Sequence, residues 1–132
     1  MMSLQKLYVP LALLILLLFL LSLGWGIIKF LEKSADTLLQ STQKVESLIT
    51  SRKWQEAEKT FQQTKQEWAR IRQYWPLLIH HQEMDRIEEC IAKIKSYLHH
   101  KDSNNALAEI YVLISYIQHI PENKTLNLQN IF

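Results

Sequence analysis

The chain has 132 residues, which is enough for one domain of ordinary size. Its 15 Lys and Arg residues and 13 Asp and Glu residues leave a formal net charge of +2, a balance that argues against a nucleic-acid partner. Both glycines, Gly24 and Gly26, lie in one apolar stretch near the N-terminus, so residues 29–132 contain none. That excludes glycine-rich phosphate loops and dinucleotide-binding fingerprints from this part of the chain.

The first element is the uncharged segment from Leu7 to Ile28, in which 18 of 22 residues are apolar. As a helix it would be about 33 Å long, and the hydrocarbon core of a bilayer is about 30 Å thick. The segment therefore predicts a transmembrane anchor in contact with membrane lipid. Pro10 is expected in the first turn, where its missing N–H costs little. We expect two parts: tail and anchor over 1–28, and a helical domain over 29–132.

A cleaved signal peptide is the alternative for this segment, and cleavage would release a secreted soluble helical protein. Ser22 and Gly24, and likewise Gly24 and Gly26, offer small residues two apart, as a signal peptidase requires. The apolar run exceeds the usual signal-peptide core of about 7–15 residues, which favours the anchor. The positive charges that flank the segment nearly balance, so the positive-inside rule determines its orientation only weakly. The amino terminus and Lys6 lie on one side, and Lys29 and Lys33, offset by Glu32, lie on the other. The order of short tail, span and domain favours a single-pass protein of the cell membrane with an extracytoplasmic helical domain.

Four apolar stripes with helical spacing follow. Their first and last members are Leu31 and Ile49, Trp54 and Ile71, Met84 and Leu98, and Ala106 and Ile120. The second helix should end near Gln73, because Pro76 disfavours helical geometry in the residue before it. The fourth should begin after an N-cap at Asp102 or Ser103 and stop at Pro121. Nothing interrupts the chain between the span and the first stripe, so the membrane helix is expected to continue into it.

The second and fourth stripes align at a spacing of 49 residues, starting with Arg52 opposite Lys101. Each follows another helix, so we predict an all-α fold: one N-terminal transmembrane helix followed by a small helical bundle of two stacked αα-hairpins. The fourth helix is apolar over much of its circumference and is expected at the centre of the bundle. The C-terminal tail is expected to pack back across the bundle through Leu126, Leu128, Ile131 and Phe132.

Candidate chemistry is sparse. His81 and Asp85 lie one turn apart on one helical face, and such a pair can supply part of a metal site. A third ligand would have to come from another helix, so a solvated polar face is the simpler interpretation. Cys90, the only cysteine, has no histidine one turn away and is expected to be a small buried side chain. We therefore predict no catalytic residues, no metal and no cofactor.

Residues 68–75 combine two Trp, one Tyr and two Arg, a composition common at binding surfaces. Trp68 belongs to the core stripe, whereas Tyr74 and Trp75 at the turn are the better surface candidates. Together with His81, Glu83 and Asp85 they form our predicted binding set.

The run 68–88, with Trp75-Pro76-Leu77-Leu78-Ile79-His80-His81 at its centre, resembles the central motif of a bacterial family catalogued as domain of unknown function 4363. Segments 101–109, 119–122 and 126–132 fit the same family. The N-terminal span and the helix that contains Trp54 and Ala57 fit it too, so the resemblance covers nearly the whole chain. It implies a small single-span membrane protein, typical of Gram-positive, spore-forming lineages, and no established activity. His81-x-Glu83-x-Asp85 is the first place to look for a functional surface, although Glu83 lies about 200° from the other two by the helical step.

The leading hypothesis is a non-enzymatic, membrane-anchored module that binds another membrane or envelope protein, because no catalytic constellation accompanies the span. The alternative is an extracytoplasmic ligand or metal sensor that uses the face of His81 and Asp85.

Overall fold

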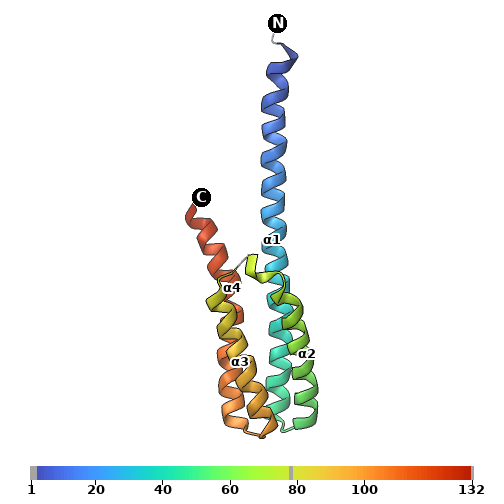
Figure 1. The fold of residues 1–132 in the computed structure, drawn as a ribbon, viewed down its shortest axis with the longest axis vertical. Helices are drawn as coiled ribbons and strands as arrows, with labels where there is room; N and C mark the ends of the chain where they lie inside the picture. Colours follow the sequence, from blue (N-terminus) through green and yellow to red (C-terminus); the bar gives the residue numbers. More distant parts are fainter. Residues whose placement is uncertain (1–2, 78, 132) are drawn as a thin grey trace. The chain divides into compact units, whose positions relative to one another are not determined.

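The computed structural model describes the backbone of residues 3–77 and 79–131, and the side chains of 3–77 and 79–120. These residues form four α-helices and one short 3-10 helix (Figure 1): α1 Leu4–Thr50, α2 Trp54–Arg72, η1 Trp75–Leu77, α3 His81–His99 and α4 Ser103–Ile131. No strand occurs in the part of the chain so described, and the predicted all-α class is confirmed. The chain divides into two compact units, Met1–Phe30 and Leu31–Phe132.

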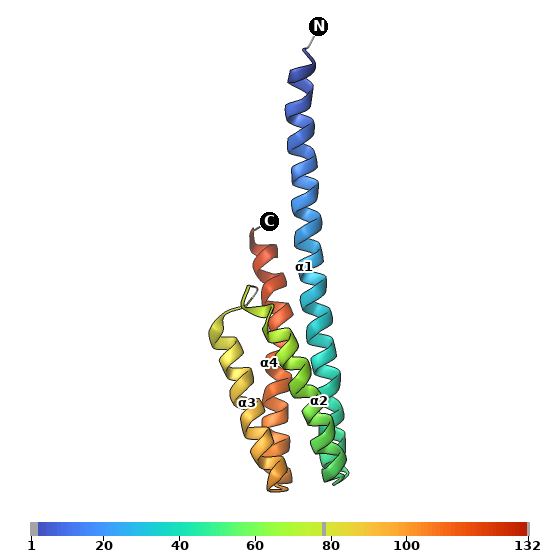
Figure 2. The same ribbon diagram turned by 45° about the vertical axis from the view of Figure 1, so that its right-hand side comes forward.

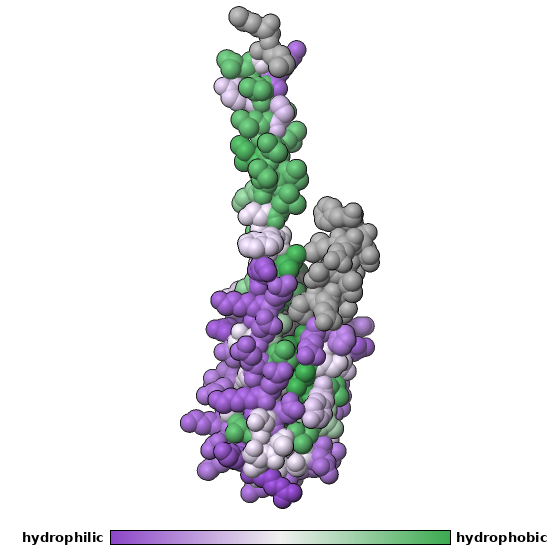
Figure 3. All heavy atoms as spheres, turned by 180° about the vertical axis from the view of Figure 1, so that it is seen from behind, coloured by the Kyte–Doolittle hydropathy of each residue, from purple (hydrophilic) through white to green (hydrophobic). Residues whose placement is uncertain are grey.

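The first unit consists mainly of exposed apolar side chains, which are drawn in green in Figure 3. The exposed fraction of the leucine side chains in segment 7–23 ranges from 48% at Leu11 to 61% at Leu13. The helix is long and apolar enough either to cross a membrane or to serve as a signal sequence. One detail differs from expectation: α1 begins at Leu4, so Pro10 lies in the second turn and not the first. A proline there leaves the Lys6 carbonyl without the amide donor of a regular helix.

The second unit is a bundle made of residues 31–50 of α1 together with α2, α3 and α4, arranged as two hairpins (Figures 1 and 2). Each helix buries one stripe, and the apolar stripes predicted from the sequence form the core. Its largest fully buried members are Trp75, Leu38, Ile49, Ile87, Ile94, Leu98, Ile110, Leu113 and Ile117. Trp54, at the start of the second stripe, is only half-buried.

The repeat at a spacing of 49 is present in the backbone of the two hairpin turns. Arg52 and Lys101 have φ angles of 56° and 53°, the only positive values among the described non-glycine residues. In the first turn, Arg52 N–H donates to Ile49 O and Lys53 N–H donates to Leu48 O, both at 2.9 Å. The residues 49 positions later make the same two bonds at 3.1 and 2.9 Å. Both helices thus end in a Schellman motif, in which a left-handed residue closes the last turn.

Helix α4 differs from expectation in two respects. It continues to Ile131, so the predicted stop at Pro121 is wrong: a proline removes one bond of the helical ladder, to the Ile117 carbonyl, and the following residues can resume the pattern. The tail therefore stays helical where we expected it to turn back, and its side-chain packing lies outside the described residues.

Nor is α4 central in the bundle. Tyr111 is 57% and Val112 39% exposed, because in a ring of four helices each one keeps an outward face whatever its composition.

Candidate functional site

The predicted binding residues at the start of α3 do not converge on one site. His81 and Asp85 are exposed, whereas Glu83 is half-buried on another face, as the helical step requires. Glu83 lies beside Arg86, Tyr116 and other residues around a cavity of about 320 Å³ between α3 and α4. Among the described residues, no group of three His, Cys, Asp or Glu side chains is placed to hold a metal ion. This geometry gives the metal-sensor alternative no support.

Tyr74 and Trp75 are neighbours in sequence with opposite fates. Tyr74 is 52% exposed, as expected of a surface candidate, but Trp75 is fully buried, so its predicted surface position is wrong. Its ring meets Trp68 edge-on, with centroids 5.5 Å apart and planes at 84°. The sequence carried a signal for this: Trp68, Ile71 and Trp75 continue the α2 stripe in steps of three and four. Helix α2 ends before Pro76, but the 3-10 helix that follows keeps Trp75 on the same face as the stripe. Its indole therefore packs at the end of the core.

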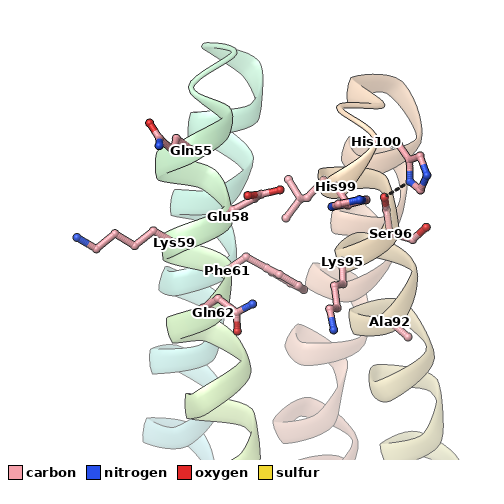
Figure 4. Close-up of a pocket in the computed structure, with 11 residues that line it drawn as sticks. Gln55, Glu58, Lys59, Phe61, Gln62, Ala92, Lys95, Ser96, His99 and His100 are labelled. Carbon is pink, nitrogen blue, oxygen red and sulfur yellow. Dashed lines mark hydrogen bonds between the residues drawn. The ribbon is translucent and has the colours of Figure 1, made fainter.

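Two recesses of the described surface lie between α2 and α3. Two cavities, of about 600 and 690 Å³, share the lining residues Ala92 and Lys95 and so are neighbours along the two helices; we call the pair the α2–α3 groove. Figure 4 shows its half near the hairpin turns, where Phe61 reaches from α2 toward α3. The floor consists of buried apolar side chains: Phe61, Trp68, Ile91 and Leu98.

Small residues explain why the groove exists. Ala69 on α2 and Ala92 on α3 are both exposed and line it, and neither fills the space that longer side chains would occupy. Arg72 and Glu88 join the two helices near the other end, with Arg72 Nε 2.7 Å from Glu88 Oε1. The groove is therefore bounded by an ion pair and lined by alanines in its middle.

The rim of the groove is mainly cationic. Lys59, Lys65 and Lys95 line it and form no ion pair within the described side chains, while Glu58 is the unpaired carboxylate among them. His99 also lines the groove and lies opposite Glu58 in Figure 4. An apolar floor with an excess of positive charge at its edges suits a partner that is apolar on one face and acidic beside it.

The prediction that Cys90 is a small buried side chain is confirmed. Burial raises the pKa of its thiol to about 12, and a hydrogen bond to Glu109 and the charge of that carboxylate act in the same direction. The nearby Lys93, 3.0 Å from Glu89 and 3.7 Å from Glu109, offsets this only in part. A thiol with such a pKa is protonated at neutral pH, and thiolate is the reactive form.

Comparison with known proteins identifies a family and nothing more specific. No curated protein and no solved structure matches the chain. The family model described as Domain of unknown function (DUF4363) matches residues 25–131, which include the four helices of the bundle and both hairpin turns. On the strength of that match, the chain belongs to the DUF4363 family.

Proposed function

We propose that this protein is a non-enzymatic, single-pass membrane-anchored module whose helical domain lies outside the cytoplasm and binds another membrane or envelope protein through the α2–α3 groove. The observation that carries the anchor is the exposed apolar surface of α1. Segment 7–28 has ten Leu, three Ile, one Phe and one Val, and at about 0.3–0.6 kcal/mol each their insertion would gain roughly 4.5–9 kcal/mol. In water the same side chains would form a large apolar patch.

The bundle supports a binding role because the α2–α3 groove is a recess that ends on apolar side chains. Its floor residues Phe61, Trp68, Ile91 and Leu98 belong to the buried core, so a partner that entered the groove would meet a fixed apolar surface. Amphipathic helices commonly dock in such grooves. The unpaired Lys59, Lys65 and Lys95 favour a partner that presents carboxylates along the rim.

The absence of enzymatic activity is proposed on two further observations. The single thiol is kept protonated by its surroundings, and the histidine and carboxylate predicted as a pair at the start of α3 are both exposed, away from either groove cavity. Catalytic groups are usually found in recesses that shift their pKa values.

Site-specific photo-cross-linking of the full-length chain in its native membrane tests the groove. A photoreactive residue replaces Lys95 in the groove or, as a matched control, Lys44, an exposed lysine of α1 outside it. We expect one discrete adduct from position 95 and none from position 44, with the partner then identified by mass spectrometry. Adducts of equal yield from both positions, or none from 95, would refute the groove as the binding site.

Charge reversal sharpens that test. The pair Lys59→Glu and Lys95→Glu should abolish the adduct formed from a photoreactive group at Gln62, which also lines the groove, while Lys44→Glu leaves it unchanged. The anchor is tested separately by alkaline carbonate extraction and by N-terminal sequencing of the mature chain. Release of the intact chain, or a mature form that begins after Gly26, would replace the anchor by a peripheral or secreted protein.

A further inference from the structure

The connection between α2 and α3 carries exposed apolar side chains. Leu77 is 87% exposed, more than any other large apolar side chain described, and Tyr74 is 52% exposed. Pro76 between them is exposed as well. We call residues 74–77 the apolar turn.

The apolar turn is held in shape from both sides. Trp75 is fully buried and Ile79 is 5% exposed, so core side chains flank the exposed ones. Ile79 N–H donates to Trp75 O at 2.9 Å and Leu77 N–H donates to Tyr74 O at 3.3 Å. The exposure of Leu77 is therefore built into the turn, because folding it inward would displace Trp75 from the core.

The register of the first hairpin fixes the end of the bundle at which the apolar turn lies. Helices α1 and α2 are antiparallel neighbours, joined by a hydrogen bond between the hydroxyls of Ser41 and Thr64. Ten residues back along α1 from Ser41 is Leu31, and ten residues on along the chain from Thr64 is Tyr74. Both stretches rise about 15 Å at ~1.5 Å per residue, so Tyr74 lies level with Leu31, the first residue of the unit.

Chain length then limits the distance from this end of the bundle to the proposed span. Leu31 comes three residues after Ile28, which allows at most about 10 Å even for an extended chain and about 4.5 Å for a helix. A bilayer of about 40–45 Å with a hydrocarbon core of ~30 Å leaves roughly 5–8 Å of headgroup region on each side. This short connection keeps Leu31 close to the headgroup region, and Tyr74 belongs to the same end of the bundle.

We propose that the apolar turn inserts Tyr74, Pro76 and Leu77 into the interfacial region of the bilayer, as a second lipid contact beside the anchor. Tyrosine is favoured at that depth because its ring is apolar and its hydroxyl stays hydrated, and the leucine side chain loses its contact with water. This inference rests on the proposed membrane anchor. Tethering by the anchor lets a small contact suffice, because insertion is then intramolecular.

Depth-dependent quenching of a small polar probe tests the contact in the full-length protein, reconstituted in phospholipid nanodiscs that carry a lipid-bound quencher near the headgroups. In a Cys90→Ser background, single cysteines replace Gln73 beside the turn, Ser51 in the opposite turn of the bundle, or Leu16 in the span. The probe at Gln73 leaves Tyr74, Pro76 and Leu77 intact. We expect at least about twofold quenching at positions 16 and 73 and little at 51, because the first two lie within or next to the bilayer.

A substitution separates insertion from mere proximity. Leu77→Asp should reduce the quenching at position 73 toward that at position 51, whereas Leu77→Met should preserve it; because Leu77 is exposed, neither change should lower the melting temperature. Equal quenching at 73 and 51, or quenching at 73 that Leu77→Asp does not alter, would overturn the insertion. Lack of quenching at position 16 would instead refute the anchor, and with it the inference.

Discussion

In the first hairpin of the bundle, α1 contributes Ser34 and Thr42 to the buried surface and α2 contributes Thr60 and Thr64. In the second hairpin, the buried side chains described for α3 and α4 are hydrocarbon apart from the sulfur atoms of Met84 and Cys90. The turns of the two hairpins nevertheless have the same backbone bonds and the same left-handed residue. The two hairpins therefore share the backbone geometry of their turns but not the chemistry of their interfaces. One kind of turn can join helices that pack through hydroxyl groups or through hydrocarbon side chains.

Two of the buried hydroxyls in the first hairpin are satisfied within their own helices. Thr42 and Thr64 donate their hydroxyls to the carbonyls of Leu38 and Thr60, at 2.8 and 3.1 Å. Because the Thr64 proton is used in this way, Ser41 is the donor in the bond between Ser41 and Thr64. A side-chain bond between helices has geometric requirements that leucine contacts lack, so it fixes the register of α1 against α2.

The largest difference should appear when the apolar interface is truncated. Ile94 is fully buried in α3, and Ile94→Ala should lower the free energy of unfolding by about 2–5 kcal/mol through lost burial and a residual cavity. Ile94→Val, which removes a single methylene, should cost about 0.5–1.5 kcal/mol. Urea denaturation followed by circular dichroism measures both; equal losses would mean that the site collapses around the truncation.

The polar interface should respond to the loss of a hydroxyl at nearly constant volume. Thr64→Val should cost about 1–2 kcal/mol, because Ser41 loses its acceptor in a partly buried position. Thr64→Ser keeps the hydroxyl and serves as the control, with loss of one methyl group only. In a double-mutant cycle with Ser41→Ala, a coupling energy near zero would contradict an energetic role for the bond between α1 and α2.

The helix starts after the two turns differ in capping. Asp102 accepts a hydrogen bond from the Asn105 amide at 3.2 Å, whereas Lys53 at the same place in the first hairpin makes no side-chain cap. Asp102→Ala should therefore cost about 1 kcal/mol, and Lys53→Asp should gain a similar amount or less. Thermal unfolding compares the two variants, and a stability loss from Lys53→Asp would show that the first hairpin needs a cation there.

The smallest effects belong to the shared turn. Arg52 and Lys101 adopt a conformation that costs a non-glycine residue roughly 1 kcal/mol. Glycine at either position should be more stable than alanine by about that amount; alanine is the control because it removes the charge and keeps the strain. The difference between glycine and alanine should be equal in the two hairpins. A gain in only one of them would show that the turns are not equivalent in solution.

Sequence patterns predicted the helices well because burial on one face of a helix leaves a periodic signal. The boundary near Gln73 and the cap at Asp102 follow from rules that act within four residues, and both are confirmed. The predictions for Trp75 and Pro121 were wrong because both assumed that a proline ends the helical pattern. Helix α4 instead continues through Pro121, and Trp75, next to Pro76, remains in the buried stripe of α2.

The candidate groove was not visible in the sequence at all. Ala69 and Ala92 are ordinary exposed alanines until α2 and α3 lie side by side, and the charges of Lys59 and Lys95 become one rim only across that interface. Such a site depends on which solvent-exposed helix faces lie next to each other in the fold. The apolar stripe of a helix predicts only the face that it buries.

The edge-to-face contact of Trp68 and Trp75 has a practical consequence. Two indoles held at a fixed angle couple their electronic transitions, so the near-ultraviolet circular dichroism of the native protein should contain a component that depends on this pair. That optical signal reports on the bundle end beside the apolar turn and requires no label. It would allow the response of this end to lipid or to a partner to be followed in the unmodified chain.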